Sequence, residues 1–267
     1  MTADEDQIAP SFPPLMEGLE AARGEDPFAL ACARAQEGCD AGLITHAITA
    51  DTLSAALVLA PEVPLGKAMV MLPTLGIGLQ NALGVLAPPE VAVLLSWDGD
   101  ILVNGARCGR FRVAASEGDA TEPPGWLVVG FTLQLIPQDP ETPGLTPDQT
   151  SLYDEGCSEV LPPLLLEAWA RHSLLWINRW DDEGVKPLHA EWEGLVVKLG
   201  EAVDFTLPGG ERVQGTFIGV DEDFGMLLRP QSDTGADAEA DADAGDATAQ
   251  TTRLLPLTDL LEGTPCR

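Results

Sequence analysis

Three arginines lie close together in a chain that is otherwise poor in basic residues. Arg107, Arg110 and Arg112 fall within six positions, although the 267 residues hold only 14 lysines and arginines, and Gly105 and Gly109 lie among them. Guanidinium groups bind carboxylate or phosphate oxygens in pairs, and glycines let backbone N–H groups approach a ligand closely. The cluster is therefore a candidate site for an anionic ligand. The alternative is that these arginines pair with the many surface carboxylates around them.

Several other kinds of site are not indicated. His46, His172 and His189 are far apart in the sequence, and none has Cys, Asp or Glu at metal-ligand spacing, so no metal site is predicted. The sequence contains neither a Gly-x-Ser-x-Gly nucleophile elbow nor a P-loop. Gly76 and Gly78 form a fragment of a dinucleotide fingerprint, but they lie within a helical pattern, which favours a packing role.

A buried sheet should position the arginine cluster. Short apolar runs rich in β-forming residues, bounded by turn residues, predict its strands. We expect these strands at residues 43–44, 53–59, 91–95, 101–103, 111–114 and 126–136.

Helices should flank this sheet, because apolar residues recur at helical spacing in several segments. We expect helices at residues 16–23, 27–37, 65–85, 164–181 and 187–192. Proline within the third of these, Pro73, should kink or restart it. The expected fold class is therefore α/β, with a mixed β-sheet flanked by helices.

The C-terminal part has a different pattern, with short alternating strands separated by polar turns. Val203, Phe205 and Leu207 alternate with polar residues, and further strands are expected at residues 212–220, 224–229 and 252–257. Such a pattern predicts a small β-barrel. Residues 231–250, a run of Ala, Asp and Gly, cannot bury enough apolar surface to order themselves, so we expect a disordered acidic insertion between two strands.

Length and composition indicate two domains. With 45% hydrophobic residues, the chain can bury a sizeable core. We expect a disordered leader at residues 1–11, an α/β domain at 12–193 and the small barrel at 194–262.

The charge and cysteine content restrict the partners and the compartment. A formal net charge of −29 would repel phosphate backbones, which excludes nucleic acid as a main partner. Five cysteines without a Cys-x-x-Cys pair favour free thiols in a reducing compartment. The first residues lack the pattern of a signal peptide, and the apolar stretch at residues 65–86 is interrupted by Lys67, Pro73 and polar amides. We therefore expect a soluble, cytoplasmic protein without a membrane partner.

Residues 96–109 (SWDGDILVNGARCG) resemble the signature of biotin protein ligases. In that signature Lys-Trp-Pro-Asn-Asp precedes a short strand, which is followed by Gly-Arg-Lys. The matching residues are Trp97, Asp100, Asn104 and Gly105.

Later segments resemble the same family in the same order. Residues 126–133 look like a later strand of the ligase domain, and residues 180–192 look like the helical segment that leads into its C-terminal domain. Residues 199–229 look like the SH3-like barrel of that C-terminal domain. The chain therefore resembles a divergent member of the biotin/lipoate A/B protein ligase superfamily from about residue 26 to residue 261.

The resemblance implies an activity and roles for residues. The family forms an acyl-adenylate from ATP and biotin, lipoate or octanoate, and transfers the acyl group to a lysine of a carrier protein. Arg107, which aligns with the family lysine, would stabilise phosphate charge, and Asp100 would orient a nucleophile or a metal ion. The substrate-binding residues would be Trp97, Gly105, Gly109, Arg110 and Arg112.

Two departures from the family pattern leave a second hypothesis open. Family members hold the adenylate under a Gly/Arg-rich loop between early strands, but residues 45–52 here contain neither glycine nor arginine. Arg107 also differs from lysine in reach and geometry. Both changes weaken the expected site for ATP and Mg²⁺. The chain is therefore either a ligase or a catalytically degraded binding or sensor module for a biotin- or lipoyl-type ligand or its carrier domain.

Overall fold

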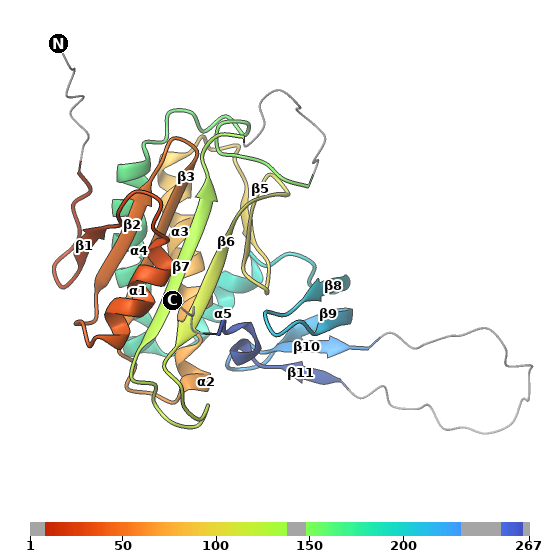
Figure 1. Ribbon diagram of the computed structural model, residues 1–267. Coiled ribbons are helices and arrows are strands. Elements are labelled where there is room, and N and C mark those ends of the chain that lie inside the picture. Colours follow the sequence, from red (N-terminus) through yellow and green to blue (C-terminus); the bar gives the residue numbers. More distant parts are fainter. Residues whose placement is uncertain (1–8, 138–147, 231–251, 264–267) are drawn as a thin grey trace, which may run out of the picture.

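The large part of the molecule is built on one mixed sheet. A computed structural model describes residues 9–137, 148–230 and 252–263. Seven strands lie in the order β1-β2-β3-β7-β6-β5-β4 (Figure 1). β1 pairs parallel with β2, and the other neighbouring strands pair antiparallel. The strands are β1 (Glu17–Glu20), β2 (Leu43–Ile48), β3 (Thr52–Leu59), β4 (Val93–Leu95), β5 (Asp100–Val103), β6 (Ala106–Ala115) and β7 (Leu127–Gln134).

The two faces of this sheet are covered unequally. On the face that we call the front face, the one helix among the described residues is α1 (Pro27–Gln36), and β6 and β7 continue beyond it toward the top of Figure 1. The opposite face is covered by α3 (Met71–Leu86) and α4 (Pro162–Glu183), which pack on each other. The short helices α2 (Leu65–Ala68) and α5 (Lys186–Glu193) complete this layer.

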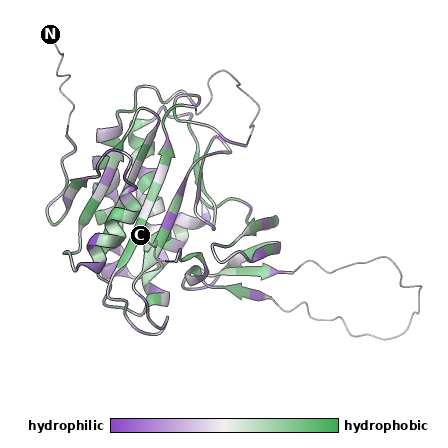
Figure 2. Cartoon of the chain, viewed as in Figure 1, coloured by the Kyte–Doolittle hydropathy of each residue, from purple (hydrophilic) through white to green (hydrophobic). Residues whose placement is uncertain are grey.

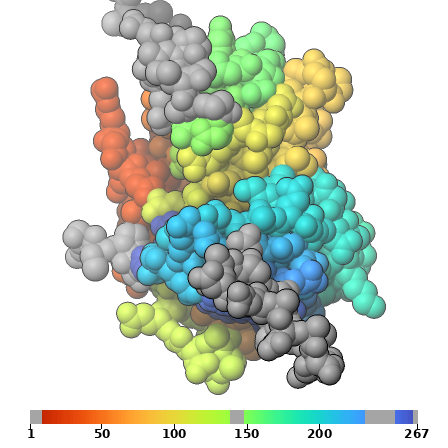
Figure 3. All heavy atoms as spheres, turned by 90° about the vertical axis from the view of Figure 1, so that its right-hand side faces the viewer, coloured from red at the N-terminus to blue at the C-terminus, as the bar shows by residue number. Residues whose placement is uncertain are grey.

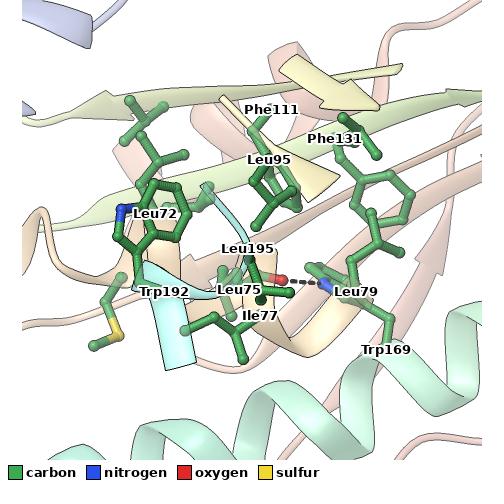
Figure 4. Packing of buried hydrophobic residues seen from close by; sticks show 14 of the residues in the cluster. Leu72, Leu75, Ile77, Leu79, Leu95, Phe111, Phe131, Trp169, Trp192 and Leu195 are labelled. Atoms are coloured by element: carbon green, nitrogen blue, oxygen red, sulfur yellow. Dashed lines mark hydrogen bonds between the residues drawn. The ribbon is translucent and has the colours of Figure 1, made fainter. Parts of the chain in front are cut away.

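The main core lies between the sheet and the α3–α4 pair (Figure 4). The Trp169 indole N–H donates a hydrogen bond of 3.2 Å to the carbonyl oxygen of Leu75, and so links α4 to α3. The same indole lies edge-on to the Phe131 ring on β7, with 4.9 Å between the ring centroids. The stretch Leu65–Leu86 is apolar enough to cross a membrane by composition, but 72% of its most apolar window is buried here. It is therefore a core element of this fold.

A glycine lets α1 pack directly on the front face. A Cβ atom at Gly130 would lie 2.8 Å from the Ala55 carbonyl oxygen and 2.9 Å from a ring carbon of Phe28, which is closer than real Cβ contacts. α1 begins at Pro27, next to this contact. Asp26 caps the helix, because its carboxylate accepts a hydrogen bond of 3.1 Å from the Phe28 backbone N–H. The first turn of α1 therefore lies over β7 and β3.

The C-terminal part is a second, smaller antiparallel sheet. Its strand order is β11-β10-β9-β8, which leaves β8 and β11 as edges in the described part of the chain, so closure into a barrel is not confirmed. Figure 3 shows its residues packed against the large domain, and Figure 2 shows apolar residues along its strands. Its elements are β8 (Ala202–Thr206), β9 (Arg212–Val220), β10 (Met226–Arg229), β11 (Arg253–Leu255) and the 3₁₀ helix η1 (Leu257–Leu260).

Most of the expected elements are confirmed, but the prediction of a helix at residues 16–23 is wrong. Residues 17–20 form β1, because pairing with β2 satisfies their backbone groups and because Phe12 packs onto Gly18, where no Cβ atom would fit. The restart at Pro73 is confirmed, since α2 ends at Ala68 and α3 begins at Met71. The predicted disordered insertion at residues 231–250, and residues 1–8 of the predicted leader, lie outside the described residues.

Trp97 links the two sheets. Its side chain is 3% exposed, and its indole N–H donates a hydrogen bond of 2.7 Å to the Phe224 carbonyl oxygen, which lies just before β10. Its ring also lies 5.9 Å from the Phe205 ring on β8.

Replacing Trp97 with Phe should therefore destabilise the whole molecule. The change leaves the buried Phe224 carbonyl without its donor, which costs about 1–3 kcal/mol in the free energy of unfolding. Chemical denaturation of the purified protein measures the loss. Trp180→Phe is the matched control, because the Trp180 indole donates no hydrogen bond within the described residues. Equal losses in both variants would contradict a role for the Trp97 hydrogen bond.

Candidate functional site

Four polar side chains form one row across the front face, which we call the polar row. Ser54 on β3 pairs with Thr132 on β7, Thr132 pairs with Arg110 on β6, and Arg110 pairs with Asp100 on β5. The Ser54 and Thr132 hydroxyl oxygens are 3.0 Å apart. Because directly paired residues share a face of the sheet, all four side chains lie on the part that α1 leaves uncovered.

Arg110 is fixed within this row. Its guanidinium donates hydrogen bonds of 3.0 Å to the Asp100 carboxylate and 3.0 Å to the Asp98 carbonyl oxygen. Arg107 is held more loosely, since its guanidinium lies 4.0 Å from the Asp100 carboxylate and 44% of its side chain is exposed. Arg107 is therefore the guanidinium of this cluster that can accept an additional anion.

The charges of this cluster perturb Asp100. Burial and the neighbouring Asp98 carboxylate raise the pKa of Asp100 above its ordinary 3.8, while Arg110 and Arg107 act in the opposite direction. Two carboxylates therefore balance two guanidiniums, and a negative ligand at Arg107 would also face Asp100.

The two glycines of the predicted site have backbone roles. Gly105, with φ +92°, forms the β5–β6 turn together with Asn104, with φ +50°. Gly109 lies where β6 meets β7, and a Cβ atom there would collide with the Thr132 carbonyl oxygen. Both glycines thus shape the strand pair that carries Arg107 and Arg110.

Trp97 and Arg112 lie apart from Arg107 and Arg110. Trp97 turns away from the front face into the contact between the two sheets, as described above. Arg112 lies on the front face two residues along β6 from Arg110, where its guanidinium lies over the Phe28 ring at 4.2 Å. Arg112 forms ion pairs of 2.7 Å with Asp26 and 2.9 Å with Glu262. The structure thus brings Arg107, Arg110 and Asp100 together and places Arg112 in a neighbouring ion-pair cluster.

A tight turn joins β2 to β3 at the edge of the polar row. β2 ends at Ile48 and β3 begins at Thr52, so three residues form the connection. The Thr49 backbone N–H donates to the Thr52 carbonyl oxygen at 2.9 Å, and the Thr49 hydroxyl accepts from the Thr52 N–H at 3.0 Å. This connection contains no loop that could fold over the front face.

Two hollows lie outside the arginine cluster. A largely apolar cavity between the two sheets, whose lining includes Trp97, Asp100 and Trp192, has a volume of about 10 Å³, enough for no more than a single water. A shallow hollow of about 240 Å³ lies on the small sheet beside Lys198 and Asp204. Neither includes an arginine of the cluster. Within the described residues, no group of three His, Cys, Asp or Glu side chains could hold a metal ion.

Sequence reasoning missed three members of this site, namely Ser54, Thr132 and Asp98. Ser54 and Thr132 are single polar residues within the apolar runs of β3 and β7. When the residues on either side of a polar residue in a strand are apolar, the polar residue indicates a solvent-accessible position on the sheet. This signal could have identified both hydroxyls.

Replacing Arg110 with Met should destabilise the protein in a pH-dependent way. Arg110 lowers the pKa of Asp100, so its loss raises that pKa further above the unfolded value of 3.8. When the pKa of a carboxyl group is higher in the folded state than in the unfolded state, the free energy of unfolding falls as the pH rises from the lower pKa to the higher one. The deficit relative to wild type should thus be small at low pH and grow to roughly 1–3 kcal/mol at neutral pH. Urea denaturation across this pH range measures it.

The double variant Arg110→Met/Asp100→Asn is the control for this pH dependence. Asparagine does not titrate, so the extra pH dependence should disappear. A deficit that is equal at all pH values in Arg110→Met would contradict the proposed coupling between Arg110 and Asp100.

Comparisons with known proteins agree with this fold. The model of the biotin/lipoate A/B protein ligase family matches residues 12–194, and a domain of unknown function (DUF4444) matches residues 199–235. None of the curated proteins compared matches the chain.

Solved structures give the same assignment. A biotin protein ligase-like protein of unknown function from Silicibacter is 53% identical, with a TM-score of 0.81, and the match covers 96% of this chain and 100% of that one. Biotin protein ligase from Aquifex aeolicus, 15% identical with a TM-score of 0.64 over 81% of this chain and 92% of that one, shares the fold. The same ligase with biotin and ATP is 19% identical, with a TM-score of 0.59 over 81% and 92%. Given the family match over residues 12–194 and the Silicibacter relative, this chain belongs to the biotin/lipoate A/B protein ligase family.

Proposed function

We propose that this chain binds the carboxylate of a biotin- or lipoate-type ligand on its front face and does not form an acyl-adenylate. The observation that carries the proposal is the three-residue connection between β2 and β3. The ligase signature places its Gly/Arg-rich adenylate loop between early strands, and here that connection is filled by a hydrogen-bonded turn.

The charges around the polar row do not fit a nucleoside triphosphate. A helix N-terminus or Gly-rich backbone and several cations usually share the phosphate charge. Here Arg110 is already bound to Asp100, which leaves Arg107 as the cation that can bind a further anion. Asp98 and Asp100 would repel the remaining phosphates, in a chain of net charge −29.

The same residues fit a single carboxylate. A guanidinium binds one carboxylate through two parallel hydrogen bonds without further cations. The Ser54 and Thr132 hydroxyls can each donate or accept a hydrogen bond, so they suit a polar group elsewhere on the ligand. Gly130 and Ala56 pair across β7 and β3 in the next row, where they are buried beneath Phe28 of α1, so the hydroxyls lie beside the first turn of this helix.

The relatives suggest which carboxylates to test. The Aquifex aeolicus structure with biotin and ATP makes biotin the first ligand, and the family description adds lipoate. Octanoate, which the sequence resemblance also implies, is the third. In this proposal the protein acts in the cytoplasm as a binding or sensor module, either for the free ligand or for the biotinyl or lipoyl carrier domain. The small sheet would correspond to the SH3-like barrel of the ligases.

Binding should be selective for the acyl ligand over ATP. Biotin, lipoate or octanoate should raise the melting temperature, because a ligand that binds only the native state stabilises it. ATP with Mg²⁺ should not raise it, and pyrophosphate release should stay at background with each ligand. Arg107→Ala should weaken acyl-ligand binding by about 10- to 100-fold through loss of a charge-assisted contact.

Arg171→Ala is the matched control, since Arg171 is an exposed arginine on α4 that pairs with Glu167. It should bind the ligand as wild type does. Pyrophosphate release that depends on Arg107 would show that the chain is an active ligase. Absence of binding by all three ligands and by their carrier domains would overturn the proposal.

A further inference from the structure

The C-terminal end of the described chain returns from the small sheet to the large one. After η1, Leu261 forms a parallel bridge with Val113 on β6. The Glu262 backbone N–H donates a hydrogen bond of 2.8 Å to the Val113 carbonyl oxygen. β5 pairs with β6 only as far as Arg110, so this segment occupies the edge that β5 leaves unpaired.

The Glu262 side chain binds Arg112 on the front face. The Arg112 Nε–H donates to both carboxylate oxygens of Glu262, at 3.1 and 2.9 Å, and a terminal nitrogen lies 2.9 Å from one of them. The other terminal nitrogen donates to Asp26 at 2.7 Å. Two carboxylates thus occupy both edges of one guanidinium, which lies on the Phe28 ring.

Arg112 lies on the front face where the first turn of α1 meets the polar row. It pairs directly with Gly130, whose other neighbour is Ala56, and it lies one row from Arg110 and Thr132. The guanidinium edge that Glu262 occupies is therefore close to the surface on which the proposed ligand would lie.

The two carboxylates on Arg112 differ in how firmly they are held. Asp26 is the N-cap of α1, and its carboxylate also accepts the Phe28 N–H, so it is fixed by the helix. The Glu262 carboxylate, by contrast, accepts hydrogen bonds only from Arg112 within the described residues. Of the two, Glu262 can leave with less change to the fold.

We propose that Glu262 is an internal competitor for the carboxylate ligand: it occupies the edge of Arg112 that a ligand carboxylate can bind, and ligand binding displaces the C-terminal segment. Arg112 would then be a second guanidinium of the site, available only in the displaced state. This inference rests on the proposed function, because it concerns access to the same front-face ligand site.

The test compares the affinity for lipoate, biotin and octanoate in four full-length proteins. Glu262→Gln keeps the size of the side chain and removes its charge, so it should bind the ligand about tenfold more tightly than wild type. Glu211→Gln is the matched control, since Glu211 forms a comparable ion pair of 2.7 Å with Arg253 on the small sheet. It should bind as wild type does. In Glu262→Gln/Arg112→Ala the gain should disappear.

A second measurement follows Arg112 itself. Phenylglyoxal modifies accessible guanidinium groups, and mass spectrometry locates the product. Arg112 should react faster in Glu262→Gln than in wild type, and the ligand should slow this reaction.

The outcomes separate the two proposals. Ligand binding that is equal in wild type and Glu262→Gln overturns the competition and leaves the proposed function in place. A gain that persists without Arg112, or that also occurs in Glu211→Gln, overturns it as well, because a general charge effect would then explain the gain. Absence of binding in all four proteins overturns the proposed function and the competition together.

Discussion

The short length of α1 governs the front face of the large sheet. A helix of ten residues extends about 15 Å, whereas β3 and β7, each of eight residues, extend about 27 Å. The helix therefore covers one end of these strands, and no other helix of the described residues covers the other end on this face. Gly130 marks the boundary, since it lets Phe28 lie directly on the sheet. Beyond that point the strands must carry polar side chains, and the polar row, from Ser54 to Asp100, is the result.

The sequence predicted most elements because their periodicity is local. The apolar spacing of α3 and the restart at Pro73 needed no knowledge of distant residues. β1 could not be found in this way, because four residues with exposed acids become a strand only when β2 and Phe12 hold them. Closure of a barrel likewise depends on contacts between strands far apart in sequence. An alternating pattern in Val203, Phe205 and Leu207 therefore predicts the strands but not how the sheet ends.

The same distinction applies to the candidate site. The sequence predicts that the three arginines lie close together, and β6 carries all of them. The structure shows ion pairs for each arginine, whereas ligand binding stays a prediction. Their individual partners depend on tertiary structure. Arg112 pairs with residues 86 and 150 positions away, Asp26 and Glu262, which no local pattern reveals. The direction in which Trp97 points also depends on where Phe224 lies, and the second sheet decides that.

The pairing of the arginines is the physical basis for the proposal that this family fold binds one anion and not ATP. In a chain of net charge −29, each buried or half-buried guanidinium attracts carboxylates from its surroundings. Arg110 and Arg112 have close carboxylate partners at 3.0 Å or less, whereas the nearest carboxylate to Arg107 among the described residues lies at 4.0 Å. One loosely held cation suffices for one carboxylate, but a triphosphate needs several cations and the backbone of a loop. The β2–β3 connection of three residues offers no such loop, and acidic partners neutralise Arg110 and Arg112. Both features would weaken the binding of a triphosphate more than that of a carboxylate.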